Sequence, residues 1–137
     1  MKKRIALLLI IVLTISMIGL TGCDQYTSSY NAVGLVTTKD SKSASLSFST
    51  FNGTKVFKLK TGDEDMSLRV YGKLEEGAAE VYCDFGQVLR QLLVMSDDSE
   101  FETSIDIPAK STLYILIESK GEAKEGKFEF ELKDKNN

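Results

Sequence analysis

Apolar and polar residues alternate with a period of two along most of the chain after residue 43. Between residues 66 and 74, for example, the apolar positions alternate with Ser67, Arg69, Tyr71 and Lys73. This alternation is typical of strands that bury one face, and helical periodicity is weak in the same region. The other runs with this pattern lie at residues 46–48, 57–59, 79–85, 101–107, 113–117 and 128–132. The pattern therefore predicts a chain made of β-strands.

Turn-forming residues separate the apolar runs. They are Asn52-Gly53, Thr61-Gly62-Asp63, Glu76-Gly77, Phe85-Gly86, Pro108-Ala109-Lys110 and the stretch from Gly121 to Gly126. Val88 to Met95 is interpreted as a further strand, because Asp97 and Asp98 follow too soon for a helix of typical length. The resulting number, about eight short strands, predicts an all-β fold with a single antiparallel β-sandwich.

The segment from Asp24 to Ser43 differs in composition from the region that follows. It is rich in Ser, Thr, Asn and Tyr, and its large aliphatic residues are few. We expect a tether that is partly free and that ends in an ordered strand. A flexible segment of ~20 residues has a root-mean-square reach of about 25 Å.

The first residues of the chain have the pattern of a targeting segment. Lys2, Lys3 and Arg4 precede an apolar run from Ile5 to Leu20. This run is shorter than the ~20 residues that a membrane-spanning helix needs, so a cleaved signal is favoured over a permanent helix. The alternative is an uncleaved N-terminal anchor in which the cysteine at position 23 has no special role.

The four residues Leu20-Thr21-Gly22-Cys23 resemble the lipobox of bacterial lipoproteins. The resemblance implies that cleavage falls before Cys23 and that its sulfur carries a diacylglyceryl group, whose two acyl chains suffice for stable attachment. It predicts three parts: a signal peptide (1–22), the lipidated cysteine with its tether (23–43) and the β-sandwich (44–137). The expected location is the cell membrane, with the domain on the extracytoplasmic side.

A second resemblance concerns the C-terminal region. Leu113 to Ile117, a turn through Gly121 and Gly126, and Phe128 to Leu132 resemble the last hairpin of small jelly-roll-like modules in secreted bacterial proteins. This resemblance implies a jelly-roll-like sandwich and says nothing about an activity.

Charge and cysteine content narrow the possibilities further. After cleavage, 17 minus 3 basic residues face 20 acidic ones. Such a net-negative body without a basic stripe argues against nucleic acid and against electrostatic adhesion to anionic lipid. With Cys23 lipidated, Cys83 is the only thiol, so no intrachain disulfide is expected. Cys83 is in phase with Val81 and Phe85, which predicts a buried apolar residue; the alternative is a reactive or metal-binding thiolate.

The chain contains no histidine. Ser-His-Asp and Cys-His nucleophilic arrangements are therefore excluded, as are zinc sites that need imidazole. We expect no enzyme, no cofactor and no metal. Two acidic loops, Asp63-Glu64-Asp65 and Asp97-Asp98 with Glu100, lack the spacing of a local calcium loop and are interpreted as solvated turns; a shared calcium site would require both loops at the same end of the sandwich.

Three tyrosines fall on the phase opposite to the apolar positions of their strands: Tyr71, Tyr82 and Tyr114. If their strands share a sheet, they form an aromatic platform beside Arg69 on which sugar rings or peptide side chains can stack. The alternative is that they make ordinary cross-strand pairs. The sequence thus predicts a membrane-anchored lipoprotein with a non-catalytic binding module, whose partner is an envelope protein or a wall polymer. The competing hypothesis is a purely structural envelope lipoprotein without a ligand.

Overall fold

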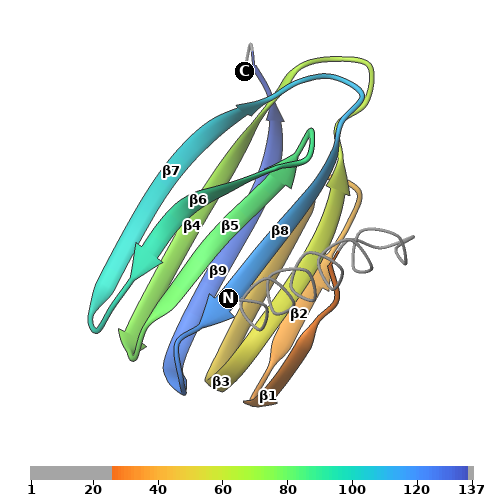
Figure 1. Cartoon of the computed structure of the whole chain (residues 1–137). Coiled ribbons are helices and arrows are strands. Elements are labelled where there is room, and N and C mark those ends of the chain that lie inside the picture. The colour runs from red at the N-terminus through yellow and green to blue at the C-terminus, as the bar shows by residue number, and fades with distance from the viewer. Residues whose placement is uncertain (1–25, 136–137) are drawn as a thin grey trace, which may run out of the picture.

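The computed structural model describes residues 26–135, and this part of the chain is built of antiparallel strands (Figure 1). The prediction of an all-β sandwich is confirmed. None of the described residues forms a helix that is long and apolar enough to cross a membrane. The signal segment and Cys23 lie outside the described residues. The strands are β1 (Ser29–Val33), β2 (Val36–Lys39), β3 (Ser43–Lys60), β4 (Met66–Glu76), β5 (Ala79–Phe85), β6 (Val88–Met95), β7 (Ser99–Ile107), β8 (Thr112–Ser119) and β9 (Ala123–Asp134).

The strands form one continuous sheet, which folds over on itself into two layers. The first half of β3 pairs with β9 and its second half pairs with β8, so one strand belongs to both layers of the sandwich. On one side of β3, β9 pairs with β4 and β4 with the outer strand β7; on the other, β8 pairs with β5 and β5 with the outer strand β6. We call these the β9 layer (the first half of β3, β9, β4 and β7) and the β8 layer (the second half of β3, β8, β5 and β6). In Figure 1 the strands β5, β6 and β8 lie in front of β4, β7 and β9.

Three glycines with positive φ lie where the chain passes from one layer of the sheet to the other. Gly53, within β3, has a φ of 130°, Gly77, between β4 and β5, has a φ of 100°, and Gly121, between β8 and β9, has a φ of 83°. Residues with a Cβ rarely adopt such angles, whereas glycine does so without steric cost. These turns gather at the lower end of the molecule in Figure 1, which we call the folded edge.

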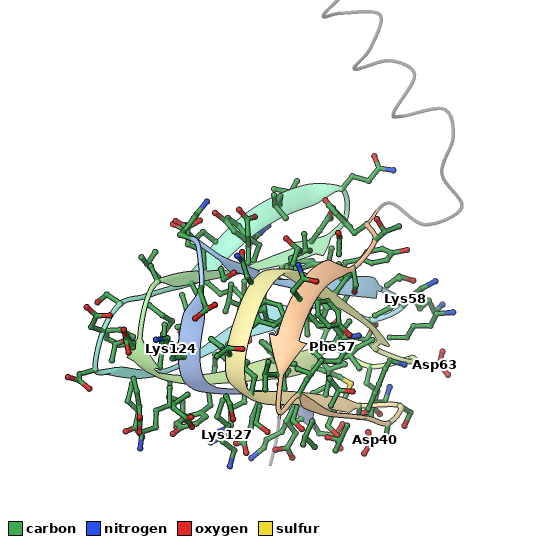
Figure 2. The ribbon with its side chains drawn as sticks, turned by 90° about the horizontal axis from the view of Figure 1, so that it is seen from below. Asp40, Phe57, Lys58, Asp63, Lys124 and Lys127 are labelled. Carbon is green, nitrogen blue, oxygen red and sulfur yellow. The ribbon has the colours of Figure 1, made fainter. Side chains whose placement is uncertain are left out.

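The hydrophobic core fills the space between the two layers. The ring of Phe57 in the β8 layer packs 6.3 Å from that of Phe130 in the β9 layer, and Figure 2 shows Phe57 inside the sandwich and Lys58 outside it. A Cβ on Gly72 of β4 would lie only 3.2 Å from Leu93 of β6, so the layers approach closely there. The predicted alternation thus identifies most of the core. Phe101 is an exception, because it lies on the outer strand β7 and is half exposed.

Three features differ from the sequence-based expectations. The runs around Phe48 and Phe57 belong to one strand, β3, which continues through the Asn52-Gly53 turn signal. The C-terminal hairpin prediction is wrong: β8 and β9 both pair with β3, and the turn at Gly121 leads from one layer to the other. The expected tether contains β1 and β2, both paired with β3, because their backbone groups complete its free edge.

Candidate functional site

The outer face of the β9 layer carries a cluster of charges around Arg69. The Arg69 Nε donates to Glu102 Oε1 at 2.8 Å, and its Nη1 lies 4.0 Å from Glu129 Oε2. These contacts stabilise the charged forms of both partners: they hold the pKa of Glu102 below its usual value and raise the pKa of Arg69. Arg69 is therefore a fixed cation on a sheet face that is otherwise rich in carboxylates.

Tyr71 lies next to Arg69 on the same face. Its ring centroid is 6.0 Å from the Arg69 guanidinium carbon, and its hydroxyl donates to Glu100 Oε1 at 3.1 Å. Desolvation and this hydrogen bond raise the pKa of Tyr71. The two residues form a flat aromatic and cationic surface of the kind that stacks against rings and planar groups.

A shallow basin of about 410 Å³ adjoins Arg69 on this face. It contains hydrogen-bond donors and acceptors side by side. Asp40 accepts from the backbone amides of Lys42 (2.9 Å) and Ser43 (2.8 Å), and the Lys42 amide bond is the main cause of its lowered pKa. The polar residues that line the basin are Thr38, Asp40, Lys42, Ser43, Ser45, Arg69, Glu129 and Glu131. We call this surface, together with Tyr71, the Arg69 basin.

The outer face of the β8 layer carries a different group of residues. Tyr82 on β5 and Tyr114 on β8 lie on neighbouring strands, and Asp84 pairs directly with Tyr114. Tyr26, upstream of β1, packs its ring 5.5 Å from that of Tyr114 and donates its hydroxyl to Asp84 Oδ2 at 2.6 Å. Asp84 is 5% exposed, so this hydrogen bond satisfies a buried carboxylate.

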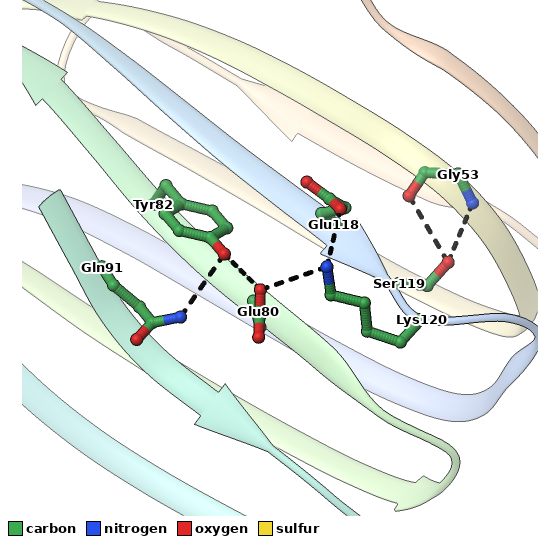
Figure 3. Close-up of polar contacts among 7 residues, drawn as sticks. All are labelled: Gly53, Glu80, Tyr82, Gln91, Glu118, Ser119 and Lys120. Carbon is green, nitrogen blue, oxygen red and sulfur yellow. Dashed lines mark hydrogen bonds and ion pairs between the residues drawn. The ribbon is translucent and has the colours of Figure 1, made fainter. Parts of the chain in front are cut away.

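A chain of polar contacts extends along the same face (Figure 3). Tyr82 donates its hydroxyl to Glu80, and this bond is the main cause of the raised pKa of Tyr82 and of the lowered pKa of Glu80. Lys120 contacts Glu80 at 3.5 Å and Glu118 at 3.0 Å. The tyrosine hydroxyl and the charged groups therefore have protein partners.

The structure divides the predicted aromatic platform between two faces. Tyr82 and Tyr114 lie on the β8 layer, whereas Arg69 and Tyr71 lie on β4 in the β9 layer. Because the outer faces of a sandwich point in opposite directions, one ligand cannot contact all four residues. Tyr26 escaped the sequence-based selection, since it lies outside any alternating run and reaches Asp84 only through tertiary folding.

Cys83 lies in the core, and the two acidic loops lie at the ends of the strands. Cys83 is fully buried, and desolvation raises the pKa of its thiol to about 12, as expected for an apolar core residue. Asp98 hydrogen-bonds through its amide to Glu75 near the end of β4, whereas Asp65 immediately precedes the start of that strand. The two acidic loops thus lie at opposite ends of the sandwich, which prevents the shared calcium site considered above.

The Tyr26 hydrogen bond predicts a pH dependence of stability. Desolvation, followed by the bond to Asp84, raises the pKa of Tyr26 from 10.0 to about 12. The folded state therefore favours the protonated phenol, and this contribution is complete below pH 10 and is lost as the pH rises towards 12. We expect the free energy of unfolding, measured with urea, to fall over this interval less in Tyr26→Phe than in the parent protein. Identical slopes in the two proteins would contradict the assignment.

No protein-family model matches the chain, and no curated protein matches it. Among solved structures, it is similar to a family 29 carbohydrate-binding module in complex with mannohexaose, with 12% identity over 78% of this chain and 91% of that chain and a TM-score of 0.40. It is also similar to insecticidal crystal protein Cry2Aa, with 10% identity over 81% of this chain and 22% of that chain and a TM-score of 0.43. A third is a cupin superfamily protein from Desulfitobacterium hafniense, with 13% identity, coverage of 85% and 87%, and a TM-score of 0.31.

Proposed function

We propose that the chain is a lipid-anchored protein of the extracytoplasmic side of the cell membrane, and that its sandwich is a non-catalytic module that binds a polar ligand. The anchor is supported by the order of parts in residues 1–23, which ends in Leu20-Thr21-Gly22-Cys23. Attachment to a bilayer raises the local concentration of the module at its partner, so even a weak contact becomes effective.

The Arg69 basin is the observation that supports the binding role. Residues that carry donors and residues that carry acceptors line it together, and Tyr71 provides an aromatic ring beside Arg69. This arrangement suits a hydroxyl-rich ligand, because each hydroxyl both donates and accepts hydrogen bonds. We propose a polymer of the cell wall as the ligand class. A purely structural role is the second candidate, since Glu102 and Glu129 already engage Arg69.

A binding assay with matched variants tests the basin. Arg69→Ala removes its central cation, and losing a charged hydrogen bond of about 1.5–3 kcal/mol weakens binding by about tenfold or more. Lys73→Ala, on the same strand and face but outside the basin, is the control and should bind as the parent does. The measurement is co-sedimentation of the folded variants with isolated cell wall.

The same assay separates the two candidate roles. If Arg69→Ala and Tyr71→Ala both sediment with the wall as much as the control, the basin does not bind the wall polymer. If the parent protein itself fails to sediment, the structural role is favoured. Circular dichroism of each variant ensures that a loss of binding is not a loss of folding.

A further inference from the structure

The chain is fixed to the β8 layer almost immediately after Cys23. Tyr26 is held by its bond to Asp84 and by its contact with the Tyr114 ring. Two residues later, Ser28 Oγ accepts a hydrogen bond from the Val56 amide at 2.9 Å, and β1 begins at the next residue. The segment that joins Cys23 to the sandwich, which we call the leash, therefore ends at Tyr26 and not near residue 43.

The length of this leash limits how far the sandwich can lie from the lipid. Three residues span at most about 10–11 Å when fully extended, much less than the ~25 Å expected for a flexible tether of ~20 residues. The two layers of a sandwich are themselves ~10 Å apart. A lipid on Cys23 consequently holds Tyr26, and with it the adjacent end of the β8 layer, close to the membrane surface.

The surface around Tyr26 has the composition of an interfacial contact. Gly86 and Gln87 form a two-residue turn with φ values of 69° and 65°, which makes the β5–β6 hairpin tip tight. Beside this turn, Val88 is 53% exposed and Leu89 is 50% exposed. Leu89 pairs directly with Asp84, the residue that holds Tyr26. The apolar tip therefore lies next to the attachment point of the leash.

Lysines complete this surface. Lys58 pairs with Tyr114 and points outward, and Figure 2 shows it on the exterior of the sandwich. Lys60 and Lys110 line one hollow together with a single carboxylate, that of Asp63. None of the three lysines has an ion-pair partner within residues 26–135. Apolar residues flanked by lysines are typical of surfaces that contact lipid headgroups.

We infer that the β5–β6 hairpin tip and the Tyr26 end of the β8 layer rest in the headgroup region of the membrane that holds the Cys23 lipid. The orientation rests on the proposed lipid anchor and adds to it the direction in which the module faces. The Arg69 basin, on the outer face of the other layer, points away from the bilayer towards the wall. The sequence did not predict this surface, because the net charge of the whole chain is negative and the lysines come together only in the folded sheet.

Site-specific fluorescence quenching tests the orientation in the full lipidated protein. Leu89→Cys places a thiol at the hairpin tip, and Lys124→Cys places one near the folded edge on the β9 layer. Each is labelled with an environment-sensitive fluorophore and reconstituted in phosphatidylglycerol vesicles that carry a nitroxide on the headgroup. Cys83 stays unlabelled because its thiol is buried and its pKa is about 12. We expect several-fold stronger quenching at position 89 than at position 124.

Three outcomes are informative. The first concerns a sample that mass spectrometry shows to be lipidated. If quenching there is equal at the two positions, or stronger at position 124, the orientation is overturned and the anchor stays intact. A bare Cys23 sulfur overturns the anchor and the orientation with it. The third uses a control with a flexible Gly-Ser insertion of ~20 residues between Cys23 and Tyr26, whose reach is about 25 Å. The difference in quenching between positions 89 and 124 should shrink in this control. If the difference persists, the short leash is not its cause.

Discussion

The Gly53→Ala substitution should destabilise the protein by about 3 kcal/mol or more, because two effects add at this position. The φ of 130° is strained for any residue with a Cβ. A Cβ there would also lie 2.6 Å from the Tyr30 Cα and closer still to the Ser29 carbonyl oxygen, both of which belong to the backbone of β1. Backbone atoms paired in a sheet cannot move aside as a flexible side chain does.

Thermal and urea unfolding of the Cys23→Ser form measure this effect. A loss of this size lowers the Tm by more than ~12 °C in a domain of ~100 residues. Gly121→Ala is the matched control: its φ of 83° is also positive, but a Cβ there meets nothing within 4 Å. It should cost only the backbone strain, about 1–2 kcal/mol. Equal losses at the two positions would show that the contact with β1 does not matter.

The Cys23→Ser substitution should release the protein from the membrane. Serine lacks the sulfur that receives the diacylglyceryl group, so the variant cannot gain the two acyl chains that anchor the parent protein. We expect the variant to leave the detergent phase in a phase-partition assay, or to accumulate as an unprocessed precursor. Mass spectrometry of the parent protein should find a mature N-terminus at Cys23 with the mass of two acyl chains added.

A matched variant excludes a general effect on secretion. Cys83→Ser changes the other cysteine of the chain and leaves the lipobox residues unchanged. It should remain in the detergent phase, although a hydroxyl at this fully buried position destabilises the core. If Cys23→Ser is processed and partitions as the parent does, the attachment to the membrane has another origin.

Alternation of apolar residues predicted the strands well, because burial of one face imposes a period of two wherever a strand lies. It did not predict how the strands connect in space. Asn52-Gly53 looks like a hairpin turn in the sequence, yet β3 passes through it from one layer to the other, because β8 and β9 supply partners on both sides of the fold. Pairing partners are a tertiary property that local pattern does not contain.

The candidate site was predictable to a lesser degree. The sequence selects Arg69, Tyr71, Tyr82 and Tyr114 by their outward phase, but phase alone does not tell which layer a strand joins. The Arg69 basin also needs Asp40 and Lys42, which were assigned to a tether. Their place beside Arg69 depends on the pairing of β3 with β9 and of β9 with β4, which no property of residues 40–43 indicates.

Strand β3 has a consequence for how the domain comes apart. β3 is one continuous strand whose first half pairs with β9 and whose second half pairs with β8, so neither layer can detach without losing pairs made by the strand that both layers share. To separate the two layers, the hydrogen bonds of β3 to β8 or to β9 must break. Unfolding should therefore be all-or-none, and hydrogen exchange should show the buried amide protons of the β8 layer and of the β9 layer becoming exchangeable together.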